Sequence, residues 1–248
     1  MIFDFFIKKD LPVELPVTTD IHCHIVPGVD DGSPRVDTSV EIVERMASWG
    51  IKRIFASPHV AQEMFENTPD VLDRALISLK QGIDKAGVDV EVERHAEYRL
   101  DDYAIPQIMD EDVMVKTMPS GYILVENSFI QEPWNLPQLV FDLKIKDLKP
   151  ILAHPERYYY YWGRNRVRYE ELHEAGLLFQ VNLLSLAGYY GKHEKATAEW
   201  LVNHDLVDFV GSDIHGMHHV ETIEAYLRSK ASRKHFAKLN GRLLNDTI

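Results

Sequence analysis

Residues 17–24 of the chain read VTTDIHCH, and residues 207–215 read VDFVGSDIH. Each stretch is a short run of β-forming residues that ends in acidic and imidazole side chains. Because alternate side chains of an extended segment point to the same side, His22 and His24 face one way. The same alternation applies to the Asp and His that end the second stretch. Both stretches therefore predict strands whose last residues present pairs of metal-binding groups.

Five further β-rich runs lie between these two stretches, at intervals of roughly 30 residues. They are IKRIFAS (51–57), VDVEVERHAE (88–97), YILVE (122–126), PILAH (150–154) and LLFQVN (177–182). Amphipathic stretches separate the runs, and the clearest spans 36–49. Its apolar stripe consists of Val36, Val40, Val43 and Ala47. The alternation of strand and helix predicts an α/β fold in which helices cover a parallel sheet, either open and doubly wound or closed into a barrel.

The composition is that of an ordinary globular protein. Of the 248 residues, 45% are hydrophobic and 27% are charged, and the mean hydropathy of −0.24 argues against a membrane-spanning chain. Lys and Arg number 27 against 39 Asp and Glu, and the net charge of −12 argues against nucleic acid as the partner. No repeat or linker-like stretch interrupts the sequence, so we expect residues 1–248 to form one domain.

Two further features concern the compartment and the class of chemistry. Residues 1–16, MIFDFFIKKDLPVELP, lack the long apolar core and the small-residue cleavage site of a signal peptide, which predicts a cytoplasmic protein. Cys23 is the single cysteine, so no internal disulfide forms. No Cys-x5-Arg loop surrounds it, which excludes a phosphatase with a cysteine nucleophile. Strand alternation points its thiol away from the neighbouring histidines.

Six of the seven predicted strands end in a potential metal ligand. The residues concerned are Asp20, His22 and His24, then His59, then His95 and Glu97, then Glu126, then His154 and Glu156, and finally Asp213 and His215. In parallel α/β folds the active site lies at the carboxyl ends of the strands. Imidazoles mixed with carboxylates favour Zn, Mn or Fe over Ca or Mg alone. Because carboxylates gathered at one mouth need cations to offset their charge, the pattern predicts a hydrolytic site with more than one ion.

Taken together, the motifs resemble those of the polymerase and histidinol phosphatase (PHP) superfamily of metal-dependent phosphoesterases. Within it, the sequence is similar to the CpsB/YwqE-type bacterial protein-tyrosine phosphatases of capsule and exopolysaccharide synthesis. The motifs follow the family order, and they are DIHCH (20–24), PGVDDG (27–32), SPH (57–59), HAEY (95–98), LVEN (124–127), AHPERY (153–158), NLLSLAGYYG (182–191) and GSDIH (211–215). The resemblance implies a distorted (β/α)7, TIM-like barrel.

The resemblance also implies two or three divalent ions (Mn, Fe, Mg or Zn), for which nine ligands are present. The first ion would lie on His22, His24, Glu97 and Asp213. Glu97 would bridge to a second ion, held also by Glu126 and His154. The third ion would lie on Asp31, His59 and His215.

The substrate side of the site is less complete. Arg157 stands where the family has an arginine that binds the substrate phosphate, a task that suits a planar guanidinium. A surface ion pair with Glu156 or another neighbouring residue is the alternative interpretation. The family commonly places a second arginine a few residues after the last histidine, and this chain lacks it. The residues that can replace it are His218, His219, Arg35 and Arg228.

Two further features each allow two interpretations, and the C-terminal segment predicts structure only. Asp30 either orients a histidine or moves a proton, or else it stabilises the turn in which it lies. The aromatic run at 158–162 either forms a flat wall for a substrate ring or alternates between core and surface. Residues 231–248 predict a final helix with a frayed tail.

The hypothesis that follows is hydrolysis of phosphotyrosine, in which a hydroxide that bridges the metal ions attacks phosphorus. The tyrosyl oxygen has a pKa of about 10, so a weak acid such as His215, Asp30 or a metal-bound water suffices to protonate it. The family context implies a phosphotyrosyl protein as partner, namely the tyrosine-rich tail of a bacterial tyrosine kinase.

Three alternatives stay open at this point. The first is a PHP-type small-molecule phosphatase, for example one that acts on histidinol phosphate. The second is a metal-dependent amidohydrolase or a TatD-like nuclease, although those proteins lack the DDG and HPERY contexts. The third is a barrel kept only for binding, which loss of ligands would mark. The sequence leaves the oligomeric state, the metal and the kinase open.

Overall fold

Parallel strands form two sheets at the centre of the part of the chain that the structure describes. The structure is a computed structural model and describes residues 15–61, 63–65, 67–110 and 116–248. The smaller sheet has the order β1 (Thr19–Asp20), β2 (Arg53–Ala56), β4 (Glu91–Arg94). The larger sheet has the order β3 (His59–Val60), β5 (Glu97–Arg99), β6 (Tyr122–Glu126), β7 (Lys149–Ala153), β8 (Leu178–Asn182), β9 (Phe209–Gly211). All neighbouring strands within the sheets are parallel, as predicted.

Each of the seven predicted runs contains a strand, but the expectation of a single sheet needs correction. After β2 the chain passes into β3 of the other sheet, and Pro58, which has no N–H for a strand ladder, lies at this break. After β4 it passes into β5 in the same way. His95 lies at the second break, where its Nε2 is 2.9 Å from the carbonyl oxygen of Ile21. Two of the seven segments therefore bend from one sheet into the other.

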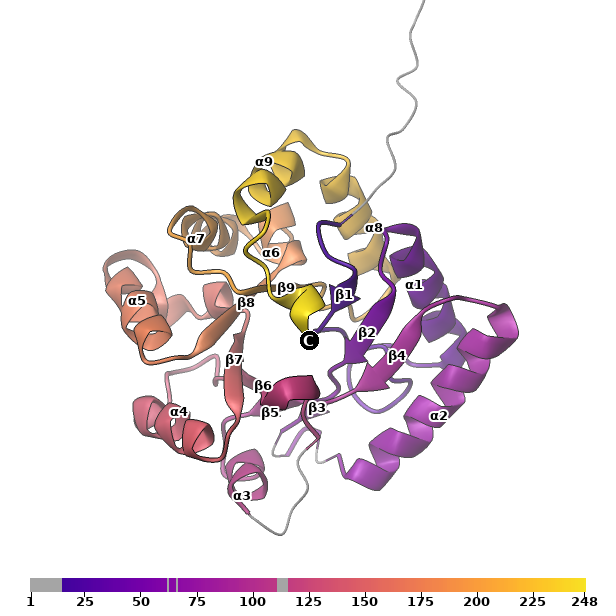
Figure 1. Cartoon of the computed structure of the whole chain (residues 1–248), viewed down its shortest axis with the longest axis horizontal. Helices are drawn as coiled ribbons and strands as arrows, with labels where there is room; N and C mark the ends of the chain where they lie inside the picture. The colour runs from indigo at the N-terminus through magenta and orange to yellow at the C-terminus, as the bar shows by residue number, and fades with distance from the viewer. Residues whose placement is uncertain (1–14, 62, 66, 111–115) are drawn as a thin grey trace, which may run out of the picture.

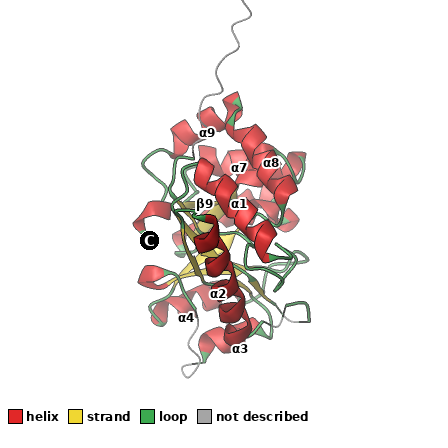
Figure 2. Cartoon of the chain, turned by 90° about the vertical axis from the view of Figure 1, so that its right-hand side faces the viewer, coloured by secondary structure: helices red, strands yellow, loops and turns green. Residues whose placement is uncertain are grey.

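Helices cover the outside of the strands. Figure 1 shows the strands around a common centre, with α1 (Val36–Ser48), α2 (Pro69–Ala86), α4 (Leu136–Ile145), α5 (Val167–Glu174) and α7 (Lys192–Asn203) outside them. Seen from the side, the strands again lie inside the helical layer (Figure 2). The other helices are α3 (Ala104–Met109), α6 (Leu183–Ala187), α8 (Met217–Leu227) and α9 (Lys230–Leu239). The 3-10 turns are η1 (Pro119–Gly121), η2 (Pro155–Arg157), η3 (Tyr159–Tyr161), η4 (Gly163–Arg166) and η5 (Asn245–Thr247). The α/β class is confirmed.

The predicted helix at 36–49 is confirmed as α1. Part of its stripe packs against α2, because a Cβ added at Gly82 would lie 2.6 Å from Val36 Cγ1 and 2.9 Å from Val40 Cγ2. Only glycine, which has no Cβ, allows the two helices to approach this closely. Val43, on the same stripe, is fully buried in the hydrophobic core.

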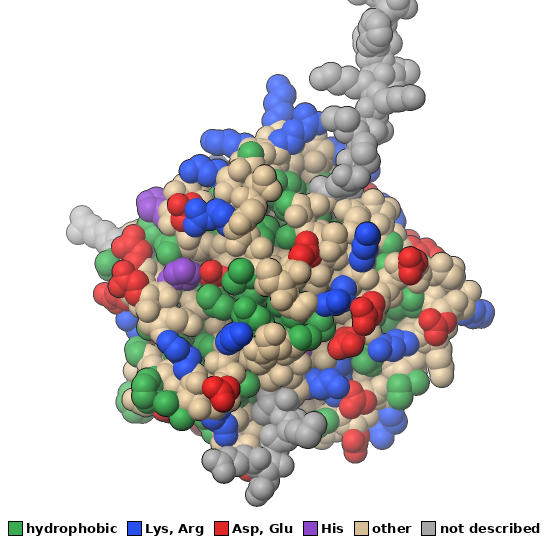
Figure 3. All heavy atoms as spheres, in the orientation of Figure 1, with side chains coloured by type: hydrophobic (Ala, Val, Ile, Leu, Met, Phe, Trp, Pro, Cys, Tyr) green, Lys and Arg blue, Asp and Glu red, His purple; other side chains and the backbone are tan. Residues whose placement is uncertain are grey.

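The C-terminal segment covers one end of the strands. Figure 1 shows it at the centre of the view, and in the space-filling view of the same face hydrophobic side chains gather there, with charged side chains of both signs around them (Figure 3). Leu244 and Ile248 pack against a buried cluster that comes mainly from the strands. Its members are Ile21, Phe55, Met118, Leu124, Ile151, Ala153 and Phe209.

Asn245 joins the first strand to the last one. Its Oδ1 accepts a hydrogen bond from the backbone N–H of Val210 at 3.1 Å. Its Nδ2 donates to the carbonyl oxygens of Thr19 at 3.0 Å and of Val210 at 2.8 Å. Asn245 is fully buried, so the expectation of a frayed tail after the last helix is wrong.

Asn245→Ala is expected to lower the free energy of unfolding by about 2–4 kcal/mol, because three buried backbone groups lose their partner. The melting temperature should fall by about 5–10 °C for a chain of this size. Asn203→Ala is the matched control, since Asn203 Nδ2 donates to Glu199 O at an exposed position. Thermal unfolding followed by circular dichroism measures both variants, and equal losses in the two would contradict the assignment.

None of the helices in the described ranges is both long and apolar enough to cross a lipid bilayer. The prediction that residues 1–16 contain no signal peptide concerns a segment whose first fourteen residues lie outside the described part. The single domain expected for residues 1–248 stays a prediction. Cys23 is buried within the hydrophobic core, which confirms that its thiol points into the protein wall.

Candidate metal centre

Four potential ligand atoms meet at the carboxyl ends of the strands: His22 Nε2, His24 Nε2, Glu97 Oε2 and Asp213 Oδ1. His22 Nε2 lies 3.3 Å from the nitrogen of His24, 3.3 Å from Glu97 and 3.4 Å from Asp213. His24 Nε2 lies 3.4 Å from Glu97 Oε2 and 3.5 Å from Asp213 Oδ1. A tetrahedral ion with bonds of about 2.0–2.1 Å separates its ligands by about 3.4 Å. The distances of the two imidazole nitrogens from each other and from the two carboxylates therefore fit ligands of a divalent ion.

The backbone is strained where two of the predicted ligands enter the site. Asp213 has φ 51° and His154 has φ 34°, both in the left-handed region. His154 follows directly on β7, and Asp213 lies two residues after the end of β9. A residue other than glycine in a sparsely populated backbone region costs about 1–3 kcal/mol, and such residues cluster at functional sites. The surrounding fold holds both side chains in place, since each is only 1% exposed.

Glu97 faces a second group with its other carboxylate oxygen. Glu97 Oε1 lies 3.1 Å from His154 Nε2, which is 3.7 Å from Glu126 Oε1. The neighbouring strands β5, β6 and β7 supply these residues: Glu97 begins β5, Glu126 ends β6 and His154 follows β7. One carboxylate therefore faces two clusters, which is the arrangement of a bridging ligand.

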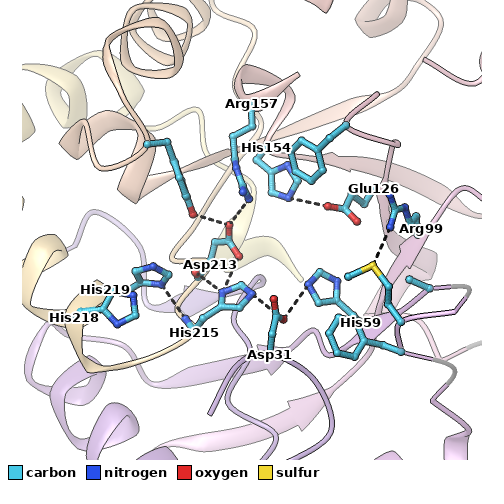
Figure 4. Close-up of a pocket in the computed structure, with 15 residues that line it drawn as sticks. Asp31, His59, Arg99, Glu126, His154, Arg157, Asp213, His215, His218 and His219 are labelled. Atoms are coloured by element: carbon cyan, nitrogen blue, oxygen red, sulfur yellow. Dashed lines mark hydrogen bonds and ion pairs between the residues drawn. The ribbon is translucent and has the colours of Figure 1, made fainter. Parts of the chain in front are cut away.

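A third group lies nearer the opening of the site. Asp31 Oδ1 is 3.6 Å from His59 Nε2 and 3.4 Å from His215 Nε2, and Figure 4 shows the Asp31 carboxylate between the two rings. His24 belongs to the same group. Each of the nine predicted ligands lies in at least one group whose ligand atoms are all within 4.8 Å of one another. The structure thus brings the whole predicted set together.

Burial and mutual charge shift the pKa values of these groups. Burial disfavours protonation of His22, but Glu97 and Asp213 outweigh it and raise its pKa to about 9. Burial also disfavours the charged form of Glu97, yet His22 and His59 hold the pKa of this carboxyl well below its ordinary value. At Glu126, burial and the charge of Glu97 raise the pKa to about 8. Two carboxylates that repel each other in a buried place favour a cation between them.

The residues present fit divalent ions. Glu97 Oε2 is buried and has no hydrogen-bond donor among the described residues, although ring nitrogens surround it. The nine side chains are five imidazoles and four carboxylates, a set that suits Zn, Mn or Fe. A buried carboxylate oxygen that has no hydrogen-bond donor and lies among ring nitrogens is suited to bind a cation.

Two buried amides orient ligands of the first group, and sequence reasoning missed both. His22 Nδ1 lies 2.7 Å from Gln180 Oε1, and Gln180 Nε2 donates to Asn182 Oδ1 at 2.8 Å. Asn182 Nδ2 in turn donates to Asp213 Oδ2. Such outer partners fix the orientation of metal ligands. Polar residues at positions 180 and 182 of an otherwise apolar strand were the available signal.

Asp30 lies behind His24. Its Oδ2 is 2.9 Å from His24 Nδ1 and accepts a hydrogen bond from His59 N at 3.1 Å, while its Oδ1 accepts from Gly32 N at 3.0 Å. Its side chain is fully buried and is not among the residues that line the adjoining pocket. These contacts orient a histidine and stabilise the turn at the same time.

The three groups open into a pocket of about 510 Å³, here called the metal pocket. Arg157 enters it, and its Nη1 donates to Asp213 Oδ2 at 3.1 Å. The guanidinium lies 4.9 Å from the centre of the Phe129 ring and 4.2 Å from that of Tyr190. Burial disfavours its charge, but Asp213 and Tyr190 keep the pKa of Arg157 above its ordinary value. Its ion-pair partner is Asp213, whereas Glu156, the alternative partner expected at the surface, is fully buried.

Of the four residues considered as replacements for the second arginine, two line the metal pocket. These are His218 and His219, whereas Arg35 and Arg228 do not line it. His219 Nδ1 accepts a hydrogen bond from His215 N at 3.0 Å. Burial lowers the pKa of His219 to about 4, so its ring is neutral near pH 7.

Arg99 also lines the metal pocket, and sequence reasoning missed it. It follows Glu97 by two positions on β5, so strand alternation places the two side chains on the same side. Figure 4 shows Arg99 beside Glu126 at one end of the pocket, with His218 at the opposite end. Arg99 is half-buried, and its Nη1 lies 3.5 Å from Met64 Sδ.

The aromatic run at 158–162 forms no wall of the metal pocket. Tyr158 and Tyr161 are buried, and Tyr159 is 57% exposed. The alternation between core and surface is therefore confirmed, and the interpretation as a substrate wall is wrong. The rings that line the metal pocket come from Phe65, Phe129 and Tyr190 instead, together with histidines.

Comparison with known proteins finds relatives along most of the chain. Residues 18–240 match the family described as "Capsular polysaccharide synthesis, CpsB/CapC". The tyrosine-protein phosphatase YwqE of Bacillus subtilis (strain 168) is 33% identical over 199 residues, which cover 80% of this chain and 77% of that protein.

A solved structure of tyrosine phosphatases is also similar to this chain. The chain is similar to a structure from the work on YwqE of Bacillus subtilis and CpsB of Streptococcus pneumoniae, which are described as unique metal-dependent tyrosine phosphatases. The TM-score is 0.75 at 29% identity, and the match covers 91% of this chain and 96% of the other. An amidohydrolase from Mycoplasma synoviae matches with a TM-score of 0.54 at 14% identity over 95% of this chain and 89% of its own, a likeness of fold alone.

Proposed function

Because the chain belongs to the CpsB/CapC family of capsular polysaccharide synthesis, we propose that it is a metal-dependent tyrosine phosphatase. The observation that carries this proposal is the convergence of nine imidazole and carboxylate side chains on one pocket, with Arg157 in the same pocket. Buried imidazoles and carboxylates hold cations, and a guanidinium beside them binds a phosphate group. Cys23, the single cysteine, is buried and takes no part.

The finer architecture that we propose is a single domain built as a distorted seven-stranded barrel. In it, β2 with β3 and β4 with β5 each count as one bent strand. The side chain of Asn245 supports closure between β1 and β9, as do two backbone hydrogen bonds just beyond the strands. These run from Asp213 N to His22 O at 2.7 Å and from His24 N to Ile214 O at 2.9 Å.

We assign two or three divalent ions to the three groups described above. The metal is Mn, Fe, Mg or Zn. When bound, such ions lower the pKa of water and offset the negative charge of phosphoryl oxygens. Glu97 would be shared between two ion sites, because one of its oxygens lies toward His22 and His24 and the other toward His154. Gln180 and Asn182 hold His22 and Asp213 in the required orientation.

Arg157 binds the phosphate of the substrate in this proposal. Its fixed position between two aromatic rings and Asp213 means that little conformational entropy is lost when a phosphate binds. His215 lines the metal pocket, and in this proposal it would hold an ion rather than donate a proton, because its Nε2 faces Asp31 and its Nδ1 lies 3.0 Å from the carbonyl oxygen of Asp213. Asp30 does not line the pocket, so we assign it as a positioning residue that acts through His24.

The partner that we propose is a phosphotyrosyl protein, the tyrosine-rich tail of a bacterial tyrosine kinase that acts in polysaccharide export, in the cytoplasm. The net charge of −12 gives no general attraction for a polyanion. Recognition therefore depends on the phosphate group, the ions and Arg157 rather than on the overall charge.

The test compares a phosphotyrosyl peptide with histidinol phosphate on the same metal-loaded protein. We expect kcat/KM for the peptide to exceed that for histidinol phosphate by at least about tenfold. EDTA should abolish the activity, and a divalent ion should restore it. Preference for histidinol phosphate would favour a small-molecule phosphatase, and activity that survives chelation would contradict the metal site.

Arg99→Ala is expected to lower kcat/KM for a phosphotyrosyl peptide by about three- to tenfold, because the pocket loses a cation at its Glu126 end. Arg74→Ala is the matched control, since Arg74 lies exposed on α2 and its replacement changes the net charge equally. Steady-state kinetics measures both variants. An unchanged value for Arg99→Ala would transfer the role of the second phosphate-binding residue to His218.

A further inference from the structure

A second hollow of about 640 Å³ adjoins the metal pocket, and we call it the side pocket. The same two chain segments line both. Arg99 lines the metal pocket while the next residue, Leu100, lines the side pocket. Phe129 lines the metal pocket while its neighbours Ser128 and Ile130 line the side pocket. The two hollows therefore share a wall at the Arg99 end of the metal pocket.

The side pocket is largely apolar and open. Its apolar lining consists of Leu100, Ile105, Pro106, Ile130, Pro133 and Trp134. Trp134 is 93% exposed and Ile130 is 75% exposed. Large apolar side chains that lie exposed together around a hollow mark a binding surface. Tyr159 holds this surface in place, because its hydroxyl donates to the carbonyl oxygen of Ile130 at 2.8 Å.

The charged residues that line the side pocket are acidic, whereas the metal pocket has two arginines among its lining residues. The polar lining residues of the side pocket, within the described part of the chain, are Asp101, Asp102, Ser128, Gln131 and Asn135. No Lys or Arg is among them, whereas Arg99 and Arg157 line the metal pocket. An acidic group would therefore meet repulsion in the side pocket, and an uncharged apolar group would not.

We propose that the side pocket is a specificity subsite that binds a large apolar side chain of the substrate polypeptide, a few residues from the phosphotyrosine. This inference rests on the proposed tyrosine phosphatase function and deepens it. A small phosphate ester fills the metal pocket alone, whereas a polypeptide also reaches across the shared wall. The subsite thus discriminates among phosphotyrosyl segments by an apolar neighbour, and Trp134 provides the main contact area.

The test uses a set of phosphotyrosyl peptides. In each peptide one flanking position carries leucine and all the others carry alanine, and the position of the leucine differs from peptide to peptide. For wild-type protein we expect leucine at one or two places to lower KM by about five- to tenfold relative to the all-alanine peptide. Trp134→Ala should abolish this gain while leaving kcat/KM for p-nitrophenyl phosphate unchanged. Phe141→Ala is the matched control, because Phe141 is 58% exposed on α4 and lines neither pocket. It should keep the full gain.

Two results would overturn the subsite. One is a leucine scan in which no place lowers KM for wild-type protein. The other is a Trp134→Ala variant that retains the gain, or that loses as much activity on p-nitrophenyl phosphate as on the leucine peptides. Wild-type protein that hydrolyses no phosphotyrosyl peptide at all would instead overturn the proposed function, and the subsite with it. Glutamate in place of leucine should give no gain, because Asp101 and Asp102 line the hollow.

Discussion

Glu97→Gln is expected to lower phosphatase activity by at least about 1,000-fold and to reduce the bound metal in the same protein. The two oxygens of Glu97 face different groups, Oε2 toward His22 and His24 and Oε1 toward His154. Glutamine keeps the shape of the side chain but removes its charge, and it cannot offer an anionic oxygen to each group. A single replacement therefore weakens two ion sites at once.

The measurement combines steady-state kinetics with metal analysis of protein purified without added metal. Glu93→Gln is the matched control, because Glu93 is an exposed residue on β4, the strand that precedes Glu97 in the chain. The control should retain both activity and metal. If Glu97→Gln retained its metal and full activity, the assignment of the bridging ligand would be wrong. His22→Ala and Asp213→Ala should behave like Glu97→Gln, since both residues belong to the same four-atom group.

Arg157→Ala is expected to lower kcat/KM for a phosphotyrosyl peptide by about 30- to 100-fold while the metal content stays the same. Arg157 is the cation that the fold holds most firmly in the metal pocket, between the rings of Phe129 and Tyr190. Its loss removes charge-assisted hydrogen bonds to the phosphate. Asp213 keeps its place without Arg157, because Asn182 and Tyr190 also donate to its Oδ2.

Arg157→Lys should recover only part of the loss, since an ammonium group cannot form a planar pair of hydrogen bonds. Arg168→Ala is the control for a nearby arginine, because Arg168 pairs with Glu132 and Glu171 outside the metal pocket. It should leave kcat/KM unchanged. Loss of metal from Arg157→Ala would show that this residue supports the ion sites rather than the substrate, and an unchanged kcat/KM would place the phosphate contact elsewhere.

Local rules explain why the sequence predicts so much of the metal centre. A ligand at the end of a strand needs only the correct residue type and the alternation of side chains, and both can be read from stretches such as the one at 17–24. Parallel strands then bring their carboxyl ends to one edge whatever the details of packing. For this reason His22, Glu97 and His154 meet in space although long segments separate them in the chain.

Residues that act through other side chains were harder to predict. Gln180 and Asn182 belong to the one predicted strand that ends in no typical ligand. The contacts of Gln180 with His22 and of Asn182 with Asp213 explain why both are polar. Arg99 lies on the same strand as Glu97, which was already the predicted ligand of that strand. An amide or a guanidinium has many ordinary roles, so its residue type alone does not distinguish them.

The α/β class and the succession of strands along the chain were determined by the sequence by itself, because residue type and two-residue alternation are properties of short segments. The set of nine expected ligands came from the resemblance of its motifs to a known family. Only the tertiary structure decided the break into two sheets, the burial of Asn245 between β1 and β9, and the side pocket around Trp134. Each of these depends on contacts between segments far apart in the chain, and no local pattern of polarity encodes which distant surface a residue meets.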